Sequence, residues 1–249
     1  MLITESLTKS FGGLKAVNSV DFEAKEKCIT LLIGPNGSGK TTLVNTVTGY
    51  YKPDSGKVYF KGEDITGLPM HETYRKGLVR TFQIPSPFSQ ISVLENLLVA
   101  ARFNPGEHLT KHLFRNSWKK YEDEYIEKAF KILQLLKLDE FCDEQPASLS
   151  AGHLKLIEIG RALAAEAKMV ILDEPIAGIN PVFAHDIFSH IVDIKKELGI
   201  TFLIVEHRLD IALKYADYVY VMNEGKVICK GTPDYVVNDE GVRKVYIGD

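Results

Sequence analysis

The strongest indication of the fold of this chain is the stretch Gly34-Pro35-Asn36-Gly37-Ser38-Gly39-Lys40-Thr41. An apolar run at residues 29–33, typical of a buried strand, comes before it, and residues 40–48 can continue as a helix. A glycine-rich loop between a strand and a helix can bring backbone N–H groups close to phosphate oxygens. The alternative, a glycine-rich turn that binds nothing, does not account for the full motif in this context. The stretch therefore predicts a site for a nucleoside triphosphate.

Three side chains next to this loop have expected roles. Lys40 should reach the β- and γ-phosphates, and the Thr41 hydroxyl should ligate Mg²⁺. Thr42 is a candidate contact to the α-phosphate. The helix N-terminus adds a favourable partial positive charge.

Two adjacent acids, Asp173 and Glu174, follow another apolar run at residues 169–172. Open α/β sheets bind ligands at the carboxyl ends of their strands, so the acids are expected near the phosphate loop. Side chains alternate along a strand, which predicts different roles for the two. Asp173 suits the Mg²⁺ shell, and Glu174 is placed to orient and polarise an attacking water. This pair favours hydrolysis over nucleotide storage.

Strand and helix patterns alternate through most of the chain. Apolar runs at residues 201–205 and 218–222 alternate with helical patterns at residues 154–165 and 182–198. Such alternation predicts an α/β fold with a largely parallel sheet.

The ends and the middle of the chain follow other patterns. Residues 22–24 and 58–60 are expected to be antiparallel strands, and Asn223-Glu224-Gly225 is expected to be a hairpin turn. From residue 85 to 145 strand signals vanish, and helical patterns predict a mostly helical insertion; they lie at residues 94–101 and 121–136.

The composition of the chain argues against some classes of function. The chain has 249 residues, 45% of them hydrophobic, and a formal net charge of -3, which argues against a nucleic-acid binder with a basic face. Three cysteines without ligand spacing are expected to be reduced thiols. We expect no signal peptide, and no segment approaches the roughly 18 continuous apolar residues of a membrane helix. Any membrane role is therefore expected to come from a partner.

A third motif, Leu149-Ser150-Ala151-Gly152-His153, opens the helical pattern at residues 154–165. Serine at a helix start is an ordinary cap or part of an anion site. Taken in order with the glycine-rich loop, Phe82-Gln83, Asp173-Glu174-Pro175 and Val205-Glu206-His207, the motif resembles the nucleotide-binding subunits of ABC transporters. The resemblance covers essentially the whole chain.

The resemblance implies a P-loop NTPase core of the ABC ATPase type, with an antiparallel β subdomain and a mostly helical insertion. Residues 1–249 would form one ABC ATPase domain. Residues 1–83 and 151–249 would form the core with the β subdomain, and residues 84–150 the helical subdomain.

The resemblance also assigns roles near the nucleotide. Phe11 matches the aromatic residue that stacks on adenine, in place of the commoner tyrosine. Gln83 matches the glutamine that senses Mg²⁺ and the attacking water, and His207 matches the switch histidine that contacts the γ-phosphate. Glu174, His207 and Gln83 would thus be the catalytic residues, and Thr41, Gln83 and Asp173 the metal site.

Two further stretches are implied to act across a dimer. Ser150 and Gly152 match the signature that contacts the γ-phosphate held by a second subunit, and Ala177-Gly178-Ile179-Asn180 matches the D-loop that crosses the dimer interface. The usual signature has Gly and Gln where this chain has Ala151 and His153. Alanine is small and neutral histidine can hydrogen-bond, so we expect a working site.

The implied ligands are ATP and Mg²⁺. The implied partners are transmembrane permease subunits and a second ABC ATPase subunit, identical or different, at the cytoplasmic face of the cell membrane. Residues 79–83 and 92–97 look like the group that imports branched-chain amino acids, although groups for urea, amides or lipopolysaccharide share much of this pattern.

Two other classes stay open. A soluble ABC-type ATPase in DNA repair or translation usually carries paired nucleotide domains, a long coiled coil or basic extensions, and none is evident here. An unrelated P-loop kinase or GTPase would not explain the signature or His207.

Overall fold

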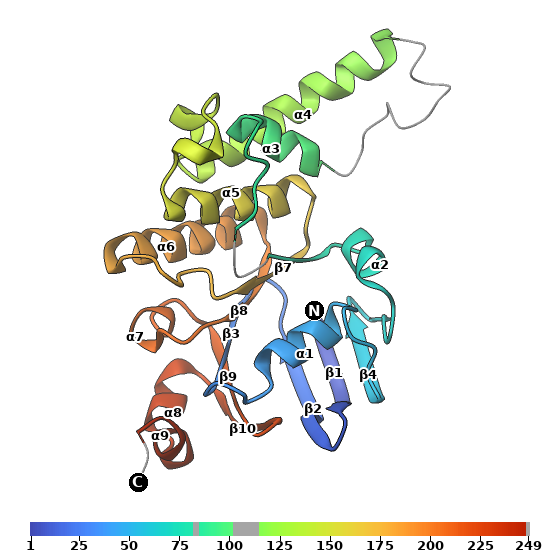
Figure 1. Ribbon diagram of the computed structural model, residues 1–249, viewed down its shortest axis with the longest axis vertical. Helices are drawn as coiled ribbons and strands as arrows, with labels where there is room; N and C mark the ends of the chain where they lie inside the picture. Colours follow the sequence, from blue (N-terminus) through green and yellow to red (C-terminus); the bar gives the residue numbers. More distant parts are fainter. Residues whose placement is uncertain (82–84, 102–114, 248–249) are drawn as a thin grey trace. The chain divides into compact units, whose positions relative to one another are not determined.

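The computed structural model describes residues 1–81, 85–101 and 115–247, which form two compact units (Figure 1). Unit 1 comprises Met1–Gln83 and Lys168–Asp249, and unit 2 comprises Ile84–Ala167.

The main sheet of unit 1 carries the strands that the apolar runs predicted. Its order is β10-β9-β3-β8-β7-β6, parallel except for β10 at the edge. Every residue of β3, β7 and β8 is buried, as expected of parallel strands covered on both faces. The strands are β6 (Leu78–Arg80), β7 (Met169–Asp173), β8 (Thr201–Val205), β3 (Ile29–Ile33), β9 (Tyr218–Asn223) and β10 (Lys226–Gly231).

The expected hairpin turn is confirmed between β9 and β10. Asn223 pairs with Lys226, leaving Glu224 and Gly225 as a two-residue loop. Both loop residues have positive φ, 47° and 77°, which matches the twist of a tight antiparallel hairpin.

A second, antiparallel sheet in unit 1 has the order β2-β1-β4-β5. The expected strands at residues 22–24 and 58–60 are confirmed, but they do not pair with each other. Both flank β1 (Leu2–Phe11), a strand that the sequence patterns did not predict. The other members are β2 (Leu14–Ala24), β4 (Ser55–Phe60) and β5 (Glu63–Asp64).

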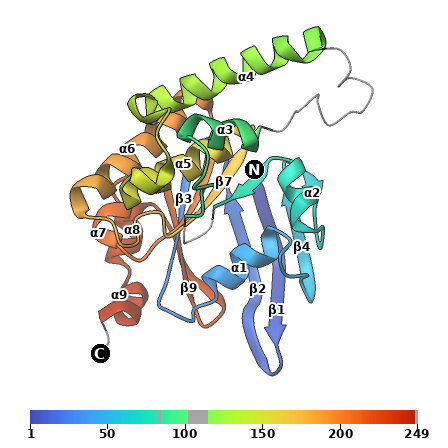
Figure 2. The same ribbon diagram turned by 45° about the horizontal axis from the view of Figure 1, so that its top comes forward.

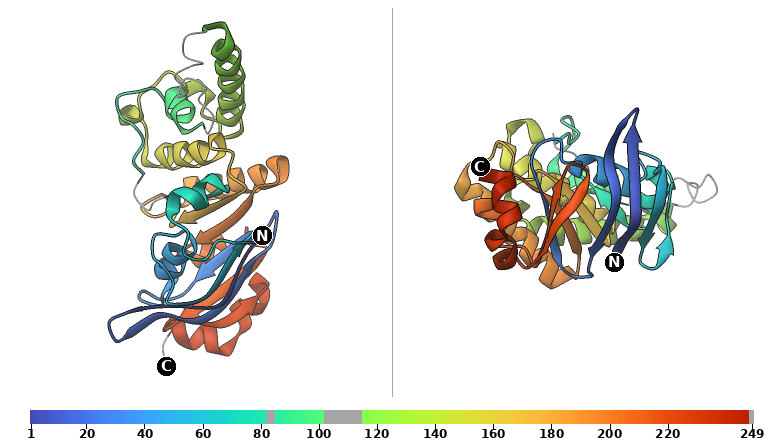
Figure 3. Two further views of the ribbon diagram at one scale, coloured as in Figure 1. Left: turned by 90° about the vertical axis from the view of Figure 1, so that its right-hand side faces the viewer. Right: turned by 90° about the horizontal axis from the view of Figure 1, so that it is seen from below.

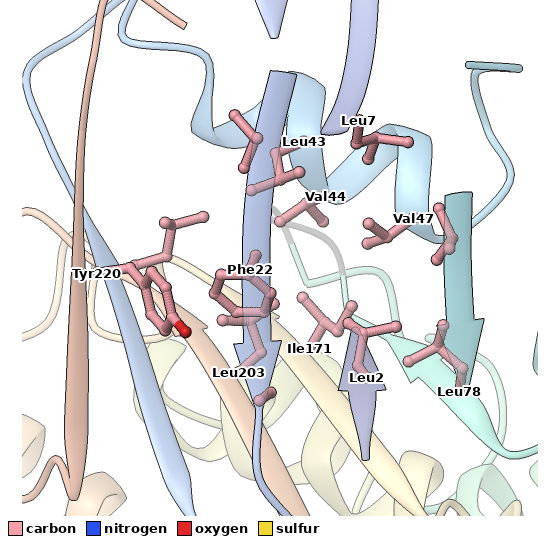
Figure 4. Close-up of a cluster of buried hydrophobic side chains, with 14 of the residues drawn as sticks. Leu2, Leu7, Phe22, Leu43, Val44, Val47, Leu78, Ile171, Leu203 and Tyr220 are labelled. Carbon is pink, nitrogen blue, oxygen red and sulfur yellow. The ribbon is translucent and has the colours of Figure 1, made fainter. Parts of the chain in front are cut away.

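Helix α1 (Lys40–Val47) joins the two sheets into one core. Its Leu43, Val44 and Val47 are buried together with Leu2 and Leu7 of β1 (Figure 4). Ile171 and Leu203 of the parallel sheet belong to the same cluster. The helix that follows the glycine-rich loop is thus anchored by apolar packing, which holds its N-terminus in place.

The remaining helices of unit 1 flank the sheets. Helices α8 (Pro233–Asn238) and α9 (Glu240–Ile247) contact β10, and Figure 3 shows them beside the hairpin that ends the sheet. The others are α2 (Met70–Arg75), α6 (Pro181–Leu198) and α7 (Leu209–Ala212).

Unit 2 is helical over its described residues, as predicted. Helix α3 (Val93–Ala100) contacts both α4 (Arg115–Leu135) and α5 (Ala151–Ala164) (Figure 2). A capping box between Ser92 and Glu95 starts α3. Two short 3₁₀ helices, η2 (Asp139–Phe141) and η3 (Pro146–Ser148), lead into α5.

The boundary between the units differs from the expected one. We expected the helical part to end at residue 150, whereas unit 2 continues to Ala167 and includes α5. The reason is packing: Gly160 of α5 lies against side chains of Leu97 and Leu136, and a Cβ there would stand only 3.0 Å from Leu136.

Among the helices of the described residues, none combines the length and the apolar character of a membrane span. The three cysteines, Cys28, Cys142 and Cys229, are free, as expected.

Candidate nucleotide site

Parallel pairing brings the carboxyl ends of β3, β7 and β8 to one edge of the sheet. Asp173, the last residue of β7, is the register partner of Val205, the last residue of β8. The Glu174 N–H also donates to the Val205 carbonyl oxygen at 2.9 Å. Segments that are distant in the sequence therefore meet where β3 enters the glycine-rich loop.

Two glycines of the loop are required by its geometry. Gly34 has φ 152°, and a Cβ there would lie 2.1 Å from the Met222 carbonyl oxygen. Gly39, with φ 103°, is the N-cap of α1, and its Cβ would lie 2.1 Å from the Ala16 carbonyl oxygen. Any side chain at either position would collide with backbone, so the tight loop depends on glycine.

Lys40 is the charged group of the loop and is 4% exposed. Its Nζ donates to the carbonyl oxygens of Gly34 at 2.9 Å and Pro35 at 3.0 Å. Burial lowers its pKa, and the carboxylates of Glu174 and Asp173 act in the opposite direction. A buried ammonium facing two acids is suited to binding an anion that brings further acceptors.

A cleft of about 340 Å³ surrounds this loop. It brings together most of the residues that we expected to handle the nucleotide, including Phe11, Glu174 and His207. Its lining consists of Phe11, Leu14, Ala16, Asn36, Gly37, Ser38, Gly39, Lys40, Thr41, Thr42, Glu174 and His207. Phe11 is 43% exposed, so much of its ring is accessible for stacking.

Glu174 and His207 form a close pair in this cleft. His207 Nε2 lies 2.9 Å from Glu174 Oε1, and the side chains are 36% and 22% exposed. Glu174 has φ 50°, a left-handed conformation that a non-glycine residue seldom adopts. Such strain concentrates at functional sites, where the surrounding structure holds it in place.

Asp173 is not among the residues that line the cleft, and it has a partner that the sequence did not predict. Arg80 Nη2 lies 2.7 Å from Asp173 Oδ2, and both side chains are at most 9% exposed. Arg80 Nη1 also donates to the Asn45 side-chain oxygen on α1. The charged end of Arg80 therefore connects β6, β7 and α1. In the sequence, Arg80 is indicated only by its position in residues 79–83, next to the motif Phe82-Gln83.

Glu206 is a second residue whose role sequence reasoning missed. It is 2% exposed, and its carboxylate accepts backbone N–H groups of Ile176, His207 and Arg208 at 3.0, 2.9 and 3.3 Å. Burial raises its pKa, and the Glu174 charge adds to this, while the three N–H donors lower it.

The other expected residues lie in three places. Residues 177–180 precede α6, where Asn180 is the N-cap and accepts the Phe183 N–H at 2.9 Å. The signature belongs to unit 2, where Ser150 caps α5 and accepts the His153 N–H at 3.3 Å. Gln83 lies outside the described residues.

Within the described parts of the chain, no group of three or more His, Cys, Asp or Glu side chains could hold a metal ion. Thr41 in the cleft lining offers a hydroxyl, and Asp173, whose Oδ2 pairs with Arg80, would offer one carboxylate. That donor set fits Mg²⁺ bound mainly by phosphates and waters, because Mg²⁺ usually takes only one or two protein carboxylates.

Comparisons with known proteins identify relatives of this chain. The family model described as "ABC transporter" matches residues 17–177. A "Probable branched-chain amino acid transport ATP-binding protein LivG" of Archaeoglobus fulgidus is 52% identical over 248 residues, covering 100% of this chain and 95% of the relative. A protein of the same name from Methanocaldococcus jannaschii is 49% identical, covering 100% and 98%.

A solved structure has the same fold as this chain. The ADP conformation of MJ1267, an ATP-binding cassette of an ABC transporter, superimposes with a TM-score of 0.86 at 47% identity, covering 100% of this chain and 99% of that one. The loop, sheet edge and cleft define a P-loop nucleotide-binding protein. The chain belongs to the ABC transporter family, as its ATP-binding cassette, and is thereby an ATPase.

Proposed function

We propose that this cassette powers import of branched-chain amino acids, by closing around ATP with a second cassette and reopening after hydrolysis. The pair of Glu174 and His207 beside the glycine-rich loop carries the proposal. The solute class rests on the names of the relatives that cover the whole chain. The cassette would act at the cytoplasmic face of the membrane through permease partners.

Binding begins with the glycine-rich loop. Its N–H groups and the N-terminus of α1 receive the phosphates, and Lys40 turns from the loop carbonyls to the β- and γ-phosphates. Phe11 stacks on the adenine. Thr41 and Asp173 would hold Mg²⁺, together with Gln83. When bound, Mg²⁺ neutralises the charge that develops on the phosphates.

Hydrolysis needs a group that positions water. Glu174 accepts the proton of the attacking water as general base. His207 Nε2 lies 2.9 Å from Glu174 Oε1, and His207 contacts the γ-phosphate when ATP is bound.

The second subunit completes the charge balance. One cleft neutralises only part of the ATP polyanion, whereas Ser150 and the N-terminus of α5 in a second cassette supply further donors. Two such sites related by a two-fold axis make a closed, head-to-tail dimer. Loss of the γ-phosphate contacts after cleavage releases the two cassettes.

The test is purification of the tagged chain from its native membranes, with co-purifying proteins identified and ATPase activity assayed. We expect membrane permeases and a second cassette to be recovered. Reconstitution of that assembly should give ATP-dependent uptake of leucine, isoleucine or valine. The Lys40→Ala variant, purified in parallel, should retain the partners and lose the uptake. Recovery with ribosomes or DNA-repair proteins instead, or uptake of urea alone, would contradict the proposal.

A further inference from the structure

The buried carboxylate of Glu206 links two loops of the site. Its Oε1 accepts the N–H of Ile176, just before residues 177–180, at 3.0 Å. Its Oε2 accepts the N–H of His207 at 2.9 Å and that of Arg208 at 3.3 Å. The Glu206 side chain therefore holds two backbone segments together. One is residues 176–180, here called the D-loop segment, and the other is the backbone of His207.

These contacts close a ring around the catalytic pair. The chain runs from Glu174 to Ile176, and Ile176 is bonded to Glu206. Glu206 holds His207, whose imidazole lies 2.9 Å from the Glu174 carboxylate. Through these contacts, a shift of Ile176 relative to Glu174 is passed by Glu206 to the backbone of His207.

A second contact joins the same two loops. Arg208 Nη1 donates to the carbonyl oxygen of Ile179, inside the D-loop segment, at 3.0 Å. The D-loop segment is thus bonded to residues 206–208 near both of its ends. Two ties at different points resist rotation as well as translation.

The chemistry of the ring requires a carboxylate. All three partners of Glu206 are N–H donors, so both of its oxygens must accept. A glutamine would direct its NH₂ group at one of these donors and leave a buried backbone N–H unsatisfied. An aspartate, one methylene shorter, could keep the adjacent N–H groups but would not reach Ile176.

We propose that Glu206 is a positioning residue that makes the D-loop segment and His207 move as one body, so that displacement of residues 176–180 sets the Glu174–His207 geometry. This deepens the proposed function and rests on it, because the pair being positioned is the one assigned to hydrolysis. A second cassette that contacts the D-loop segment would by this route adjust the catalytic pair.

The structural part is tested on the full chain without ATP. In Glu206→Gln and Glu206→Asp, hydrogen exchange at the Ile176 amide should accelerate about tenfold or more, since its buried acceptor is lost. Glu197→Gln, an exposed glutamate on α6, is the control and should leave Ile176 unchanged. Unchanged protection of Ile176 in Glu206→Asp would overturn the proposed link, whether or not the chain is an active ATPase.

The catalytic part is tested by a double-mutant cycle on turnover in the assembly recovered from membranes. Glu206→Asp should lower kcat by about 10²-fold with the KM for ATP nearly unchanged, as a 1 Å misplacement can. Combined with His207→Ala, it should lower kcat no further than His207→Ala alone. If the losses in kcat of the two single variants multiply in the double variant, Glu206 does not act through His207. A raised KM for ATP with a normal kcat would overturn the positioning role.

Discussion

His207 Nε2 lies 2.9 Å from Glu174 Oε1, although the two residues come from loops after different strands. The pairing follows from the register of β7 with β8, in which Asp173 and Val205 are partners at the sheet edge. Both strands are buried on both faces, so a slip by one residue would exchange the side chains packed in the two layers and disrupt the packing of each. The geometry of this pair thus depends on the packing of the sheet beneath it.

Removal of the loop ammonium should abolish tight nucleotide binding. Lys40→Ala is expected to weaken ATP binding by about 2 kcal/mol or more, roughly 30-fold in Kd, since a charged hydrogen bond is lost. Isothermal titration calorimetry measures the effect, with Lys196→Ala on the exposed side of α6 as control. Equal affinity in Lys40→Ala and the wild type would show that the loop is not the phosphate site.

The pair of Arg80 and Asp173 should be important for folding. Arg80→Ala leaves a buried carboxylate without its partner, which typically costs about 3–5 kcal/mol in the free energy of unfolding. Lys128→Ala breaks an exposed pair with Glu166, whose side chains are 60% and 49% exposed, and should cost about 1 kcal/mol at most. Urea unfolding of both variants makes the comparison, and similar losses would refute a special role for the buried pair.

The free energy of unfolding should depend on pH through Glu158 on α5. Burial raises its pKa, while the Ser86 N–H and the charges of Lys155 and Arg161 lower it. The folded protein therefore holds this proton more tightly than the unfolded chain does. The resulting stability is fully present below the unfolded value of 4.5 and is lost as pH rises through the folded pKa.

Comparison with Glu158→Gln isolates this group. The unfolding free energy of the wild type minus that of the variant should fall as pH rises above about 4.5 and through the raised folded pKa. Urea unfolding at several pH values gives the difference. An increase with pH would mean that the carboxylate is stabilised, not penalised, by its surroundings.

The signature serine should have two separable functions. Ser150→Ala should destabilise α5 by about 1 kcal/mol through loss of the N-cap, whereas Ser150→Gly should cost only a few tenths. Both variants lack the hydroxyl proposed to contact the γ-phosphate, so both should bind ATP normally and fail to dimerise with it. Ser92→Ala, which removes the cap of α3, should lose stability and still dimerise. Light scattering with and without ATP decides between these outcomes.

The sequence predicted the parallel sheet well because β3, β7 and β8 are continuous apolar runs. It did not predict β1, in which the alternation of buried and exposed residues breaks between Thr4 and Leu7 at a register shift. The three-residue strand β6 was too short to show a pattern. Irregular or very short strands are recognised only through their partners in the sheet.

The site was predictable where motif residues line the cleft, and not where contacts come from distant segments. Arg80 and Asp173 are 93 positions apart, so nothing local pairs them. Glu206 binds backbone N–H groups, and such donors leave no side-chain pattern in the sequence. The unit boundary was missed for a similar reason, since α5 is assigned by its packing on α3 and α4.

The proposed function requires Glu174 to activate water in a cassette that closes on ATP. The most direct measurement combines light scattering with ATP turnover for the wild type and Glu174→Gln, in the chain and in the assembly recovered from membranes. We expect the variant to bind ATP like the wild type, to accumulate as an ATP-dependent dimer and to turn over at least about 10²-fold more slowly. Turnover close to that of the wild type would contradict this role of Glu174.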